Sequence, residues 1–525
     1  MSRTFLPRSA HARCGVLIAV LLTGVAGCGG GGGNGGGGSF STWTAGVFQP
    51  SSNFAKRCVA PRAGSSDVTG TVTDQNNWLR SWTHELYLWY AEVPDLDPSQ
   101  YQTPDYFDRL KTSATTASGQ PKDKFHFTYG TTVWQQLSQA GVQAGYGLQW
   151  ALVASAPPRR AVIAYMEPNA PTATMVANLA RGADVLTVDG VDLVNINTDA
   201  GINTLNAGLF PAKAGESHTF TIRDAGSSST RTVSLQSADV TETPVQNVHT
   251  LATGIGQVGY LLFNDHIATA EGALITAVNT LKAASITDLV LDIRYNGGGY
   301  LDIASELAYM IAGPTATAGQ TFEKLQFNDK NPTTDPVTGQ ALTPTLFHST
   351  TQGFTSGLGS GQALPTLNLP RVFVLTGGGT CSASESIINS LRGVSVTVIQ
   401  IGSTTCGKPY GFYPQDNCGT TYFTIEFRGI NAQGFGDYTD GFSPNNSTGT
   451  LVGTRIPGCS VADDFTHALG DPNEGRLAAA LSYRTNGSCA GPPTGVVKAL
   501  ALHEESGADV VVPKPVWLQN RILRP

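Results

Sequence analysis

The sequence is poor in charged residues. Asp, Glu, Lys and Arg make up 14% of the 525 residues, against about 25% in an average soluble domain. The formal net charge is −7, and no stripe of basic residues with interleaved aromatics is present. We therefore expect no nucleic-acid partner. Low charge together with 61 glycines indicates a loop-rich, exported protein rather than a cytosolic one.

Beyond its N-terminus the sequence lacks an apolar run long enough to span a membrane. The first thirteen residues contain three arginines, and residues 16–25 form a short apolar run. This run suits the core of a signal peptide better than a mature transmembrane helix. It ends in Val25-Ala26-Gly27-Cys28, which resembles a bacterial lipobox. We expect residues 1–27 to be a lipoprotein signal peptide and Cys28 to carry the lipid. An ordinary signal peptide with a chance cysteine is the alternative.

A glycine tract follows the expected lipid-attachment site. Residues 29–38 are all glycine except Asn34, and such a composition behaves as a flexible tether. Residues 28–40 are therefore expected to hold a folded body away from the membrane. The sequence predicts a lipid-anchored protein of the bacterial cell envelope, on the periplasmic face and at the outer membrane.

Zinc-binding patterns are also absent, because the chain has no Cys-x-x-C pair and no cluster of histidines. Cys14 leaves with the signal peptide and Cys28 is the expected anchor. An even six cysteines remain in an oxidising compartment, which favours disulfides. The sequence does not select among the possible pairings. The six are Cys58, Cys381, Cys406, Cys418, Cys459 and Cys489.

Two segments precede the C-terminal half. Residues 41–129 are expected to form a small helical domain, with a helix that begins near Asn77 and ends at Pro94 and a second over residues 104–111. Aromatic residues recur there at helical spacing, which is typical of a packed core. Residues 130–241 predict a β-rich module with strands near Leu148 and at residues 161–164.

The β-rich module resembles a PDZ domain. Residues 181–190 contain a Gly-x-Asp turn, a strand and a second Asp-Gly turn, as in the PDZ signature. The matching carboxylate-binding loop is Gly145-Tyr146-Gly147-Leu148. The resemblance implies capture of peptide C-termini by strand addition. A β module without a ligand remains the alternative.

From residue 242 to residue 490 strands and helices alternate, which predicts βαβ units around a largely parallel sheet. Residues 313–370 are rich in Thr, Gly and Pro and predict a long excursion near the site. Residues 491–525 form a tail. The expected elements are strands at 258–263, 287–294, 371–375, 396–401 and 422–428, with helices at 270–284, 301–311 and 382–391.

Two strand-to-helix turns carry the candidate chemistry. The first, at residues 292–299, ends in three glycines that leave backbone amides accessible. No Gly-Lys-Ser/Thr follows, so a phosphate loop fits this turn poorly. The second contains Ser382 at the expected start of a helix, where the dipole favours a developing oxyanion. A plain helix N-cap is the alternative for Ser382. Lys408 follows the next strand and can return to the same edge of the sheet.

These segments together resemble the C-terminal processing (tail-specific) peptidase family. The similarity rests on Ser382-Ala383-Ser384-Glu385, on the Asn-Gly-Gly-Gly turn and on Gly407-Lys408, and it covers roughly residues 130–430. It implies an α/β core of the crotonase/Clp-like αβ spiral type. It also implies a Ser–Lys dyad in which Ser382 is the nucleophile and Lys408 the base. The substrate would be a polypeptide, with neither cofactor nor metal required.

The chemistry places demands on the residues around this dyad. Lysine titrates near ~10.4, so Lys408 can act as a base only if burial disfavours its charge, and the neighbouring residues are apolar. The expected oxyanion donors are the amides of Ala383 and of Gly297 or Gly298. Glu385 either orients Lys408 or completes a helix cap.

The sequence departs from the family at two supporting positions. The glutamine that many members carry four residues after the lysine is Phe412 here, with Gln415 as a possible substitute, and the acid about eleven residues after the serine is Gly393. Two other functions therefore stay open. One is a non-catalytic lipoprotein that binds peptides or apolar ligands, and the other is a Ser–His hydrolase that recruits His266 or His348.

Overall fold

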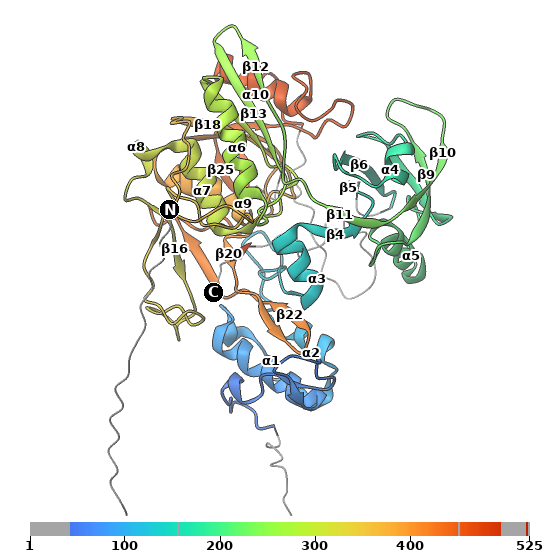
Figure 1. Cartoon of the computed structure of the whole chain (residues 1–525), viewed down its shortest axis with the longest axis vertical. Coiled ribbons are helices and arrows are strands. Elements are labelled where there is room, and N and C mark those ends of the chain that lie inside the picture. Colours follow the sequence, from blue (N-terminus) through green and yellow to red (C-terminus); the bar gives the residue numbers. More distant parts are fainter. Residues whose placement is uncertain (1–42, 155–156, 450–451, 495–520, 523–525) are drawn as a thin grey trace, which may run out of the picture. The chain divides into compact units, whose positions relative to one another are not determined.

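The computed structural model describes residues 43–154, 157–449, 452–494 and 521–522 (Figure 1). Thr44–Pro525 forms one unit and Met1–Trp43 another. The predicted signal peptide, Cys28 and the tether lie outside the described residues. Among the described residues, no helix has the length and apolarity needed to cross a membrane.

The N-terminal part of the described chain is helical, as predicted. Helix α1 spans Val72–Leu86 and α2 spans Thr103–Arg109. The sequence prediction that α1 extends to Pro94 is wrong. The helix stops at Leu86 because Tyr87 leaves the helical conformation, and its buried hydroxyl donates to Asp123 at 2.7 Å. The short strands β1 (Arg57–Cys58) and β2 (Val68–Thr69) pair before α1.

The β-rich module contains one curved sheet and a separate two-stranded ribbon. The sheet has the order β10-β9-β7-β6-β5, and β8 (Val191–Asp192) pairs with β7. The ribbon pairs β4 (Val142–Gly145) with β11 (Ala238–Thr241). Helices α4 (Thr172–Val176) and α5 (Asp199–Leu209) accompany the sheet. Its strands are β5 (Leu148–Ala154), β6 (Arg160–Met166), β7 (Asp184–Val188), β9 (Ser217–Arg223) and β10 (Arg231–Gln236).

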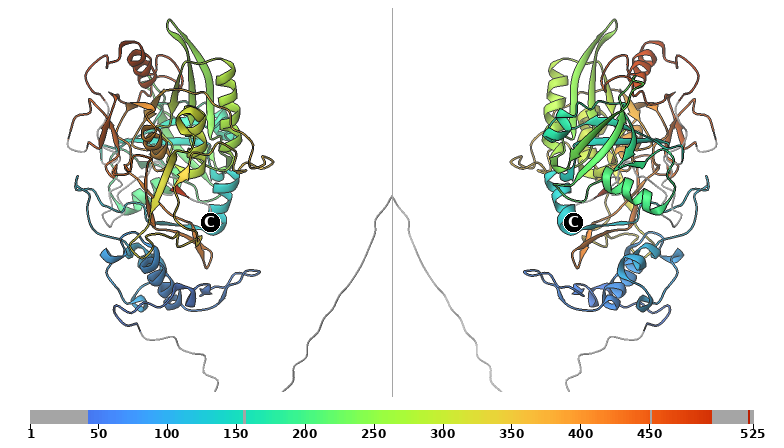
Figure 2. Two further views of the ribbon diagram at one scale, coloured as in Figure 1. Left: turned by 90° about the vertical axis from the view of Figure 1, so that its left-hand side faces the viewer. Right: turned by 90° about the vertical axis from the view of Figure 1, so that its right-hand side faces the viewer.

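The C-terminal half contains the predicted parallel sheet, which confirms a mixed α/β fold. Its order is β12-β13-β14-β18-β19-β26. The β12–β13 pair is antiparallel and every other neighbour is parallel. The hairpin of β12 and β13 extends beyond its neighbours (Figures 1 and 2). The strands are β12 (Val245–Thr253), β13 (Gly256–Phe263), β14 (Asp288–Asp292), β18 (Arg371–Thr376), β19 (Thr397–Gly402) and β26 (Gly458–Ser460).

Helices cover both faces of this sheet. Three of them, α6 (Ala270–Ala283), α7 (Leu301–Ala312) and α9 (Ala383–Gly393), pack on the face that includes Leu261 and Leu291. Helix α10 (Gly475–Asn486) packs on the face that includes Tyr260. Successive residues of β13 thus enter different cores, as the period of two in a strand requires. Burial on both faces explains the continuous apolar runs of the central strands.

Smaller sheets complete the core. One has the order β17-β16-β23-β20 and another the order β21-β22-β3. A further pair joins β24 to β25, α3 follows β3, and α8 follows α7. Their bounds are β3 (Phe127–Gly130), α3 (Thr131–Gln135), α8 (Pro314–Thr317), β16 (Thr321–Gln326), β17 (Thr345–Leu346), β20 (Tyr410–Gly411), β21 (Gln415–Asn417), β22 (Thr420–Phe423), β23 (Phe427–Ile430), β24 (Phe442–Pro444) and β25 (Thr454–Ile456).

The prediction of one strand over residues 422–428 is wrong. The chain divides there into β22 and β23, which join different sheets. The residues between them bond elsewhere, because Leu88 N donates to Ile425 O at 2.8 Å and the Thr424 hydroxyl lies 3.1 Å from His126 Nδ1. These long-range partners have no signature in the local pattern.

Residues 313–370 are more ordered than their composition indicates, since they include α8, β16 and β17. A loop in this excursion is held by Glu271, whose carboxylate accepts the backbone N–H groups of residues 352–355 at 2.6–3.0 Å. Phe354 of this loop packs against Tyr300, with ring centroids 4.7 Å apart. The excursion therefore reaches the strand β15 (Gly299–Tyr300).

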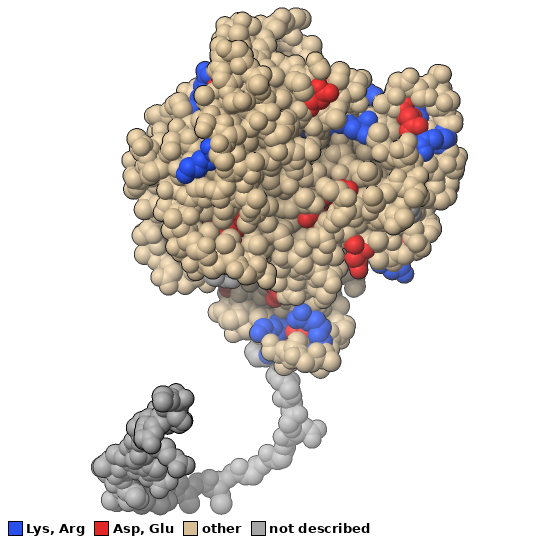
Figure 3. All heavy atoms as spheres, turned by 45° about the horizontal axis from the view of Figure 1, so that its top comes forward, with Lys and Arg blue, Asp and Glu red and all other residues tan. Residues whose placement is uncertain are grey.

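The six predicted disulfide cysteines are paired. The disulfides are Cys58–Cys418, Cys381–Cys406 and Cys459–Cys489. On the face drawn in Figure 3, basic and acidic side chains are few and scattered. That view agrees with the low charge of the sequence.

Candidate active site

Three turns meet at the carboxyl edge of the parallel sheet. They follow β14, β18 and β19, and parallel strands bring their carboxyl ends to the same edge. Cys381 N donates to Asn296 O at 3.1 Å, and Cys406 N donates to Thr380 O at 3.0 Å. The segments that carry Asn296, Ser382 and Lys408 are therefore adjacent in space.

Ser382 occupies a strained position directly before α9. Its φ is 60° and its ψ is −117°, a region that non-glycine residues rarely adopt. The side chain is fully buried, and among the described residues its Oγ has no hydrogen-bond partner. An unpaired buried hydroxyl costs about 1–3 kcal/mol. Strain combined with an unpaired polar atom is typical of a functional site.

Lys408 is fully buried in an aromatic environment. Burial lowers the pKa of its ammonium group to about 7, although Asp123 and Glu385 act in the opposite direction. The Nζ lies 4.8 Å from the Phe125 ring centroid and 4.5 Å from that of Phe412. An aromatic ring thus stands where many family members carry glutamine. Gln415, the possible substitute, pairs instead with Tyr422 between β21 and β22.

Glu385 links the turn of Ser382 to the turn of Lys408. Its buried carboxylate accepts the backbone N–H of Ser382 at 3.0 Å, of Gly407 at 2.9 Å and of Lys408 at 2.8 Å. Burial raises the pKa of this carboxyl group, and the hydrogen bonds oppose that rise. Both roles considered for Glu385 are therefore present in its contacts: it caps α9 and it orients the backbone of Lys408.

The glycine turn after β14 contains two of the predicted oxyanion donors, the amides of Gly297 and Gly298. One of these amides already makes a hydrogen bond. Gly298 N donates to Asn296 Oδ1 at 2.9 Å. No hydrogen bond of the Gly297 amide is seen in the described part of the chain. Ala383 is the first residue of α9, so its amide has no acceptor within the helix. Of the three predicted oxyanion donors, Gly298 is therefore the one whose amide is engaged within the described residues.

The two histidines of the alternative hydrolase occupy different places. His266 lies beside the glycine turn, where its Nδ1 is 3.0 Å from Asn296 Oδ1. Asn296 Nδ2 donates to Phe263 O at 3.0 Å, which fixes the orientation of the amide. Because an amide oxygen can only accept, His266 Nδ1 is the donor to Asn296 Oδ1. A Cβ at Gly299 would lie 2.6 Å from His266 O, so only glycine fits that close approach. His348 instead pairs with Asp302 at 2.9 Å.

A disulfide joins the turn that contains Ser382 to the turn that contains Lys408. Cys381 directly precedes Ser382, and its partner Cys406 lies two residues before Lys408. Ligand atoms of Cys381, Glu385 and Cys406 lie within 4.8 Å of one another. The two sulfurs are bonded to each other, however, and offer no thiolates to a metal.

Buried ion pairs also stabilise the glycine turn. Arg294 is fully buried and contacts three carboxylates, those of Asp292, Asp463 and Glu474. Arg181 of the β-rich module reaches the same cluster, with Nη2 2.6 Å from Asp463 Oδ1 and Nη1 2.8 Å from the Tyr295 hydroxyl. The β-rich module thus contacts Tyr295, within the glycine turn.

The predicted peptide-binding loop lies within the β-rich module. Gly145 ends β4, and Leu148 begins β5, the edge strand of the curved sheet. Tyr146 is buried and donates to Gly208 O at 2.8 Å. Gly147 has a φ of +68°, and a Cβ there would lie 2.7 Å from Ala170 Cβ. Its role in binding peptides remains a prediction.

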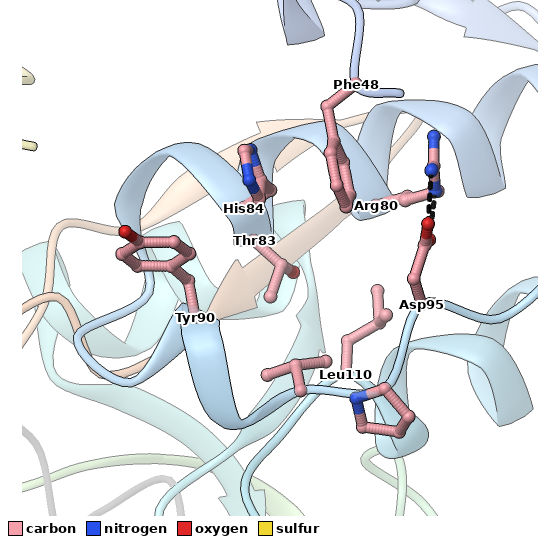
Figure 4. Close-up of a pocket in the computed structure, with 9 residues that line it drawn as sticks. Phe48, Arg80, Thr83, His84, Tyr90, Asp95 and Leu110 are labelled. Atoms are coloured by element: carbon pink, nitrogen blue, oxygen red, sulfur yellow. Dashed lines mark hydrogen bonds and ion pairs between the residues drawn. The ribbon is translucent and has the colours of Figure 1, made fainter. Parts of the chain in front are cut away.

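A surface pocket lies in the N-terminal helical part (Figure 4). Phe48 stacks on His84 with ring centroids 3.6 Å apart, and Arg80 pairs with Asp95 beside them. These contacts attach the segment before α1 to the helix. The pocket is separate from the turns described above. It is lined by Phe48, Arg80, Thr83, His84, Tyr90, Val93, Pro94, Asp95 and Leu110.

Comparison with known families identifies two segments. Residues 257–412 match the profile of "Peptidase family S41", and residues 74–128 match that of the "Peptidase S41 N-terminal domain". The chain carries peptidase family S41 domains. The first segment includes the glycine turn, Ser382 and Lys408, so the family match contains all three turns at the sheet edge.

Individual S41 relatives are distant. A carboxyl-terminal-processing protease from Picosynechococcus sp. is 26% identical over 173 residues, which covers 33% of this chain and 39% of the relative. An S41 protease structure from Bacteroides fragilis has a TM-score of 0.56 and 22% identity, and the match covers 78% of this chain and 97% of that one. Because the identity to the Bacteroides fragilis protein is only 22%, this similarity shows a shared fold and nothing more. The photosystem II D1 C-terminal processing protease has a TM-score of 0.42 and 18% identity over 74% of this chain and 94% of that chain.

Several residues around the S41 site carried no signal in the sequence. Phe125 contacts Lys408, and Asp123 accepts from Phe125 N at 2.9 Å. Both lie in the segment that matches the N-terminal domain profile, far from Lys408 in the chain. The family pattern directs attention to the glutamine position alone. The burial of Asp123 depends on tertiary packing, which the local sequence does not show.

Proposed function

We propose that the protein is a serine endopeptidase of the Ser–Lys dyad type, with Ser382 as nucleophile and Lys408 as general base. The observation that carries this proposal is a buried lysine with a pKa of about 7. It lies in the same site as a strained serine whose Oγ has no partner among the described residues. The family match supports the reaction class.

The dyad would act in two steps. Neutral Lys408 accepts the proton of Ser382 as Oγ attacks the scissile carbonyl carbon. The carbonyl oxygen then carries negative charge, which the amides of Ala383 and Gly297 stabilise. The amide C–N bond breaks as Lys408 returns the proton to the leaving amine. Lys408 then accepts a proton from water as its oxygen attacks the ester carbonyl, and it returns this proton to Ser382 Oγ as the ester C–O bond breaks.

A non-catalytic binding protein is the second candidate. Burying a lysine disfavours its charged form and so costs folding free energy. A protein that only binds ligands gains nothing from a buried lysine that would offset this cost. Phe412 occupies the position where many family members carry glutamine, and this difference is the reason to consider a binding protein. The two rings that face Lys408 can nevertheless stabilise a transient ammonium by cation–π attraction. We therefore favour the enzyme.

We further propose that the β-rich module selects polypeptide tails. The support is its edge strand β5, which follows the loop Gly145–Leu148, and its contact with Tyr295 through Arg181. Edge strands accept extended peptides, and backbone amides bind terminal carboxylates. Attachment to the membrane through Cys28 rests on the sequence alone.

One cleavage experiment tests the reaction and the tail preference. Ser382→Ala should reduce hydrolysis of an unfolded test protein by on the order of 10³-fold or more, with unchanged thermal melting. Ser482→Ala on α10 serves as the matched control and should retain activity. A peptide with a free C-terminal carboxylate should be cleaved faster than the same peptide amidated. Full activity of the Ser382→Ala protein would reject the nucleophile, and equal cleavage of both peptides would reject tail selection.

A further inference from the structure

A segment near residue 521 pairs with the strand that follows the glycine turn. Strand β27 (Arg521–Ile522) runs parallel to β15, with Gly299 opposite Arg521 and Tyr300 opposite Ile522. The same segment also contacts β20. Figure 1 shows the short red strand beside β20. A piece of the chain that is remote in sequence thus lies against two strands of the S41 core.

These two strands flank the dyad. Strand β15 begins directly after Gly298, within the turn that supplies the Gly297 amide. Strand β20 begins two residues after Lys408. The Tyr300 side chain packs with the cluster that contains Cys381 and Cys406. The segment at Arg521–Ile522 therefore contacts the strands that directly follow the turn of Gly297 and the turn of Lys408.

A peptide substrate would need a strand edge beside the dyad, such as the one that β27 occupies. An endopeptidase must hold an extended chain beside its nucleophile, and strand addition to a short edge provides main-chain hydrogen bonds that tolerate many sequences. Strand β15 already bridges to His266 on its other side through Gly299. Its remaining edge is the one that β27 occupies.

The chain is long enough to reach this place from its last core residues. Described structure resumes at Arg521 after Thr494, and the intervening residues can span up to about 90 Å when extended. A segment that belongs to the same chain binds its site in an intramolecular step. It would compete with a free peptide for the same edge.

We propose that β15 is the polypeptide-binding edge of this site and that the segment containing Arg521–Ile522 is its intramolecular occupant. The expected consequence, competition between this segment and the substrate, rests on the proposed peptidase function. The binding itself does not require turnover. The two claims can therefore fail separately.

The test uses two paired variants of the full chain, each also carrying Ser382→Ala to prevent turnover. In Arg521→Pro/Ile522→Pro both backbone N–H groups of β27 are lost, and proline is excluded from paired strands. In Arg521→Lys/Ile522→Val both N–H groups remain, so pairing should persist. Fluorescence anisotropy measures the binding of a labelled synthetic peptide with the sequence of residues 516–525.

We expect the diproline protein to bind this peptide at least about tenfold more tightly than its Lys/Val control, because the internal competitor is removed. The affinities should not depend on protein concentration. Equal affinities, or no binding to either variant, would overturn the proposal. Weaker binding at higher protein concentration would assign the segment to a second copy of the chain and would equally overturn it. With Ser382 restored, a failure of both proteins to cleave any substrate would reject the peptidase function alone.

Discussion

Residues that are far away in the chain form part of the environment of Lys408. The rings of Phe125 and Phe412 lie within 5 Å of its Nζ. Asp123 and Glu385 oppose the effect of burial on its pKa. The motif in the sequence predicted which lysine to examine. The charge state of that lysine depends on burial, which local sequence does not determine.

The pH dependence of activity should report the titration of Lys408. A general base must be neutral, and the pKa of Lys408 is about 7, so activity should rise with pH through this value. The neutral fraction is about one half at pH 7 and about nine tenths at pH 8. Initial rates between pH 5.5 and 9 would measure this acidic limb. A flat profile between about pH 6 and 8 would contradict the role.

Lys408→Arg provides the matched control, since the guanidinium of arginine stays protonated throughout this range. Its activity should be lost at every pH, and its fold should be retained if the larger head group is accommodated. Circular dichroism separates loss of folding from loss of the base.

At the scale of elements, the predicted alternation of strands and helices in the C-terminal half is confirmed, because apolar strands buried on both faces have a strong local pattern. The predictions failed where distant contacts decide the outcome. Helix α1 ends at Leu86 because Tyr87 reaches Asp123, and residues 422–428 divide between two sheets. The sequence likewise predicted six paired cysteines but not their partners.

The disulfide between the turns of the proposed dyad should affect turnover as well as stability. Cys381→Ala/Cys406→Ala should lower kcat on the order of 10–100-fold, because small displacements of reacting groups have effects of that size. The matched control is Cys459→Ala/Cys489→Ala. The two disulfides close loops of similar length, with separations of 25 and 30 residues, so each double variant should lose roughly 3 kcal/mol of stability.

The discriminating measurement is kcat at a temperature where both double variants remain folded. A positioning role predicts a lower kcat, and an altered acidic limb of the pH profile, for the pair near the dyad alone. If both double variants keep the same kcat, the Cys381–Cys406 disulfide has a structural role only.

At the scale of the whole molecule, the β-rich module and the N-terminal part both contribute to the S41 core. Arg181 of the module reaches Asp463 and Tyr295. Strand β3 of the N-terminal part pairs with β22, and the disulfide Cys58–Cys418 joins the same regions. The site is therefore assembled from segments that span most of the described chain.

Attachment to the envelope is predicted from the sequence at this same scale. Cys28→Ser should move the protein from membrane fractions to soluble fractions, because the acylated residue is lost. Cys14→Ser, within the expected signal peptide, is the matched control and should leave fractionation unchanged. The measurement is the distribution of protein after cell fractionation, and continued association of the Cys28→Ser protein with lipid would reject the anchor.

The sequence by itself determined the α/β alternation, the three turns and the two residues of the proposed dyad. These are local patterns, and the carboxyl ends of parallel strands meet at one edge. Only the tertiary structure decided the disulfide partners, the burial of Lys408 between Phe125 and Phe412, and the pairing of β27 with β15. Each of these brings together residues that are distant in the chain, and a distant contact depends on how all the intervening elements pack.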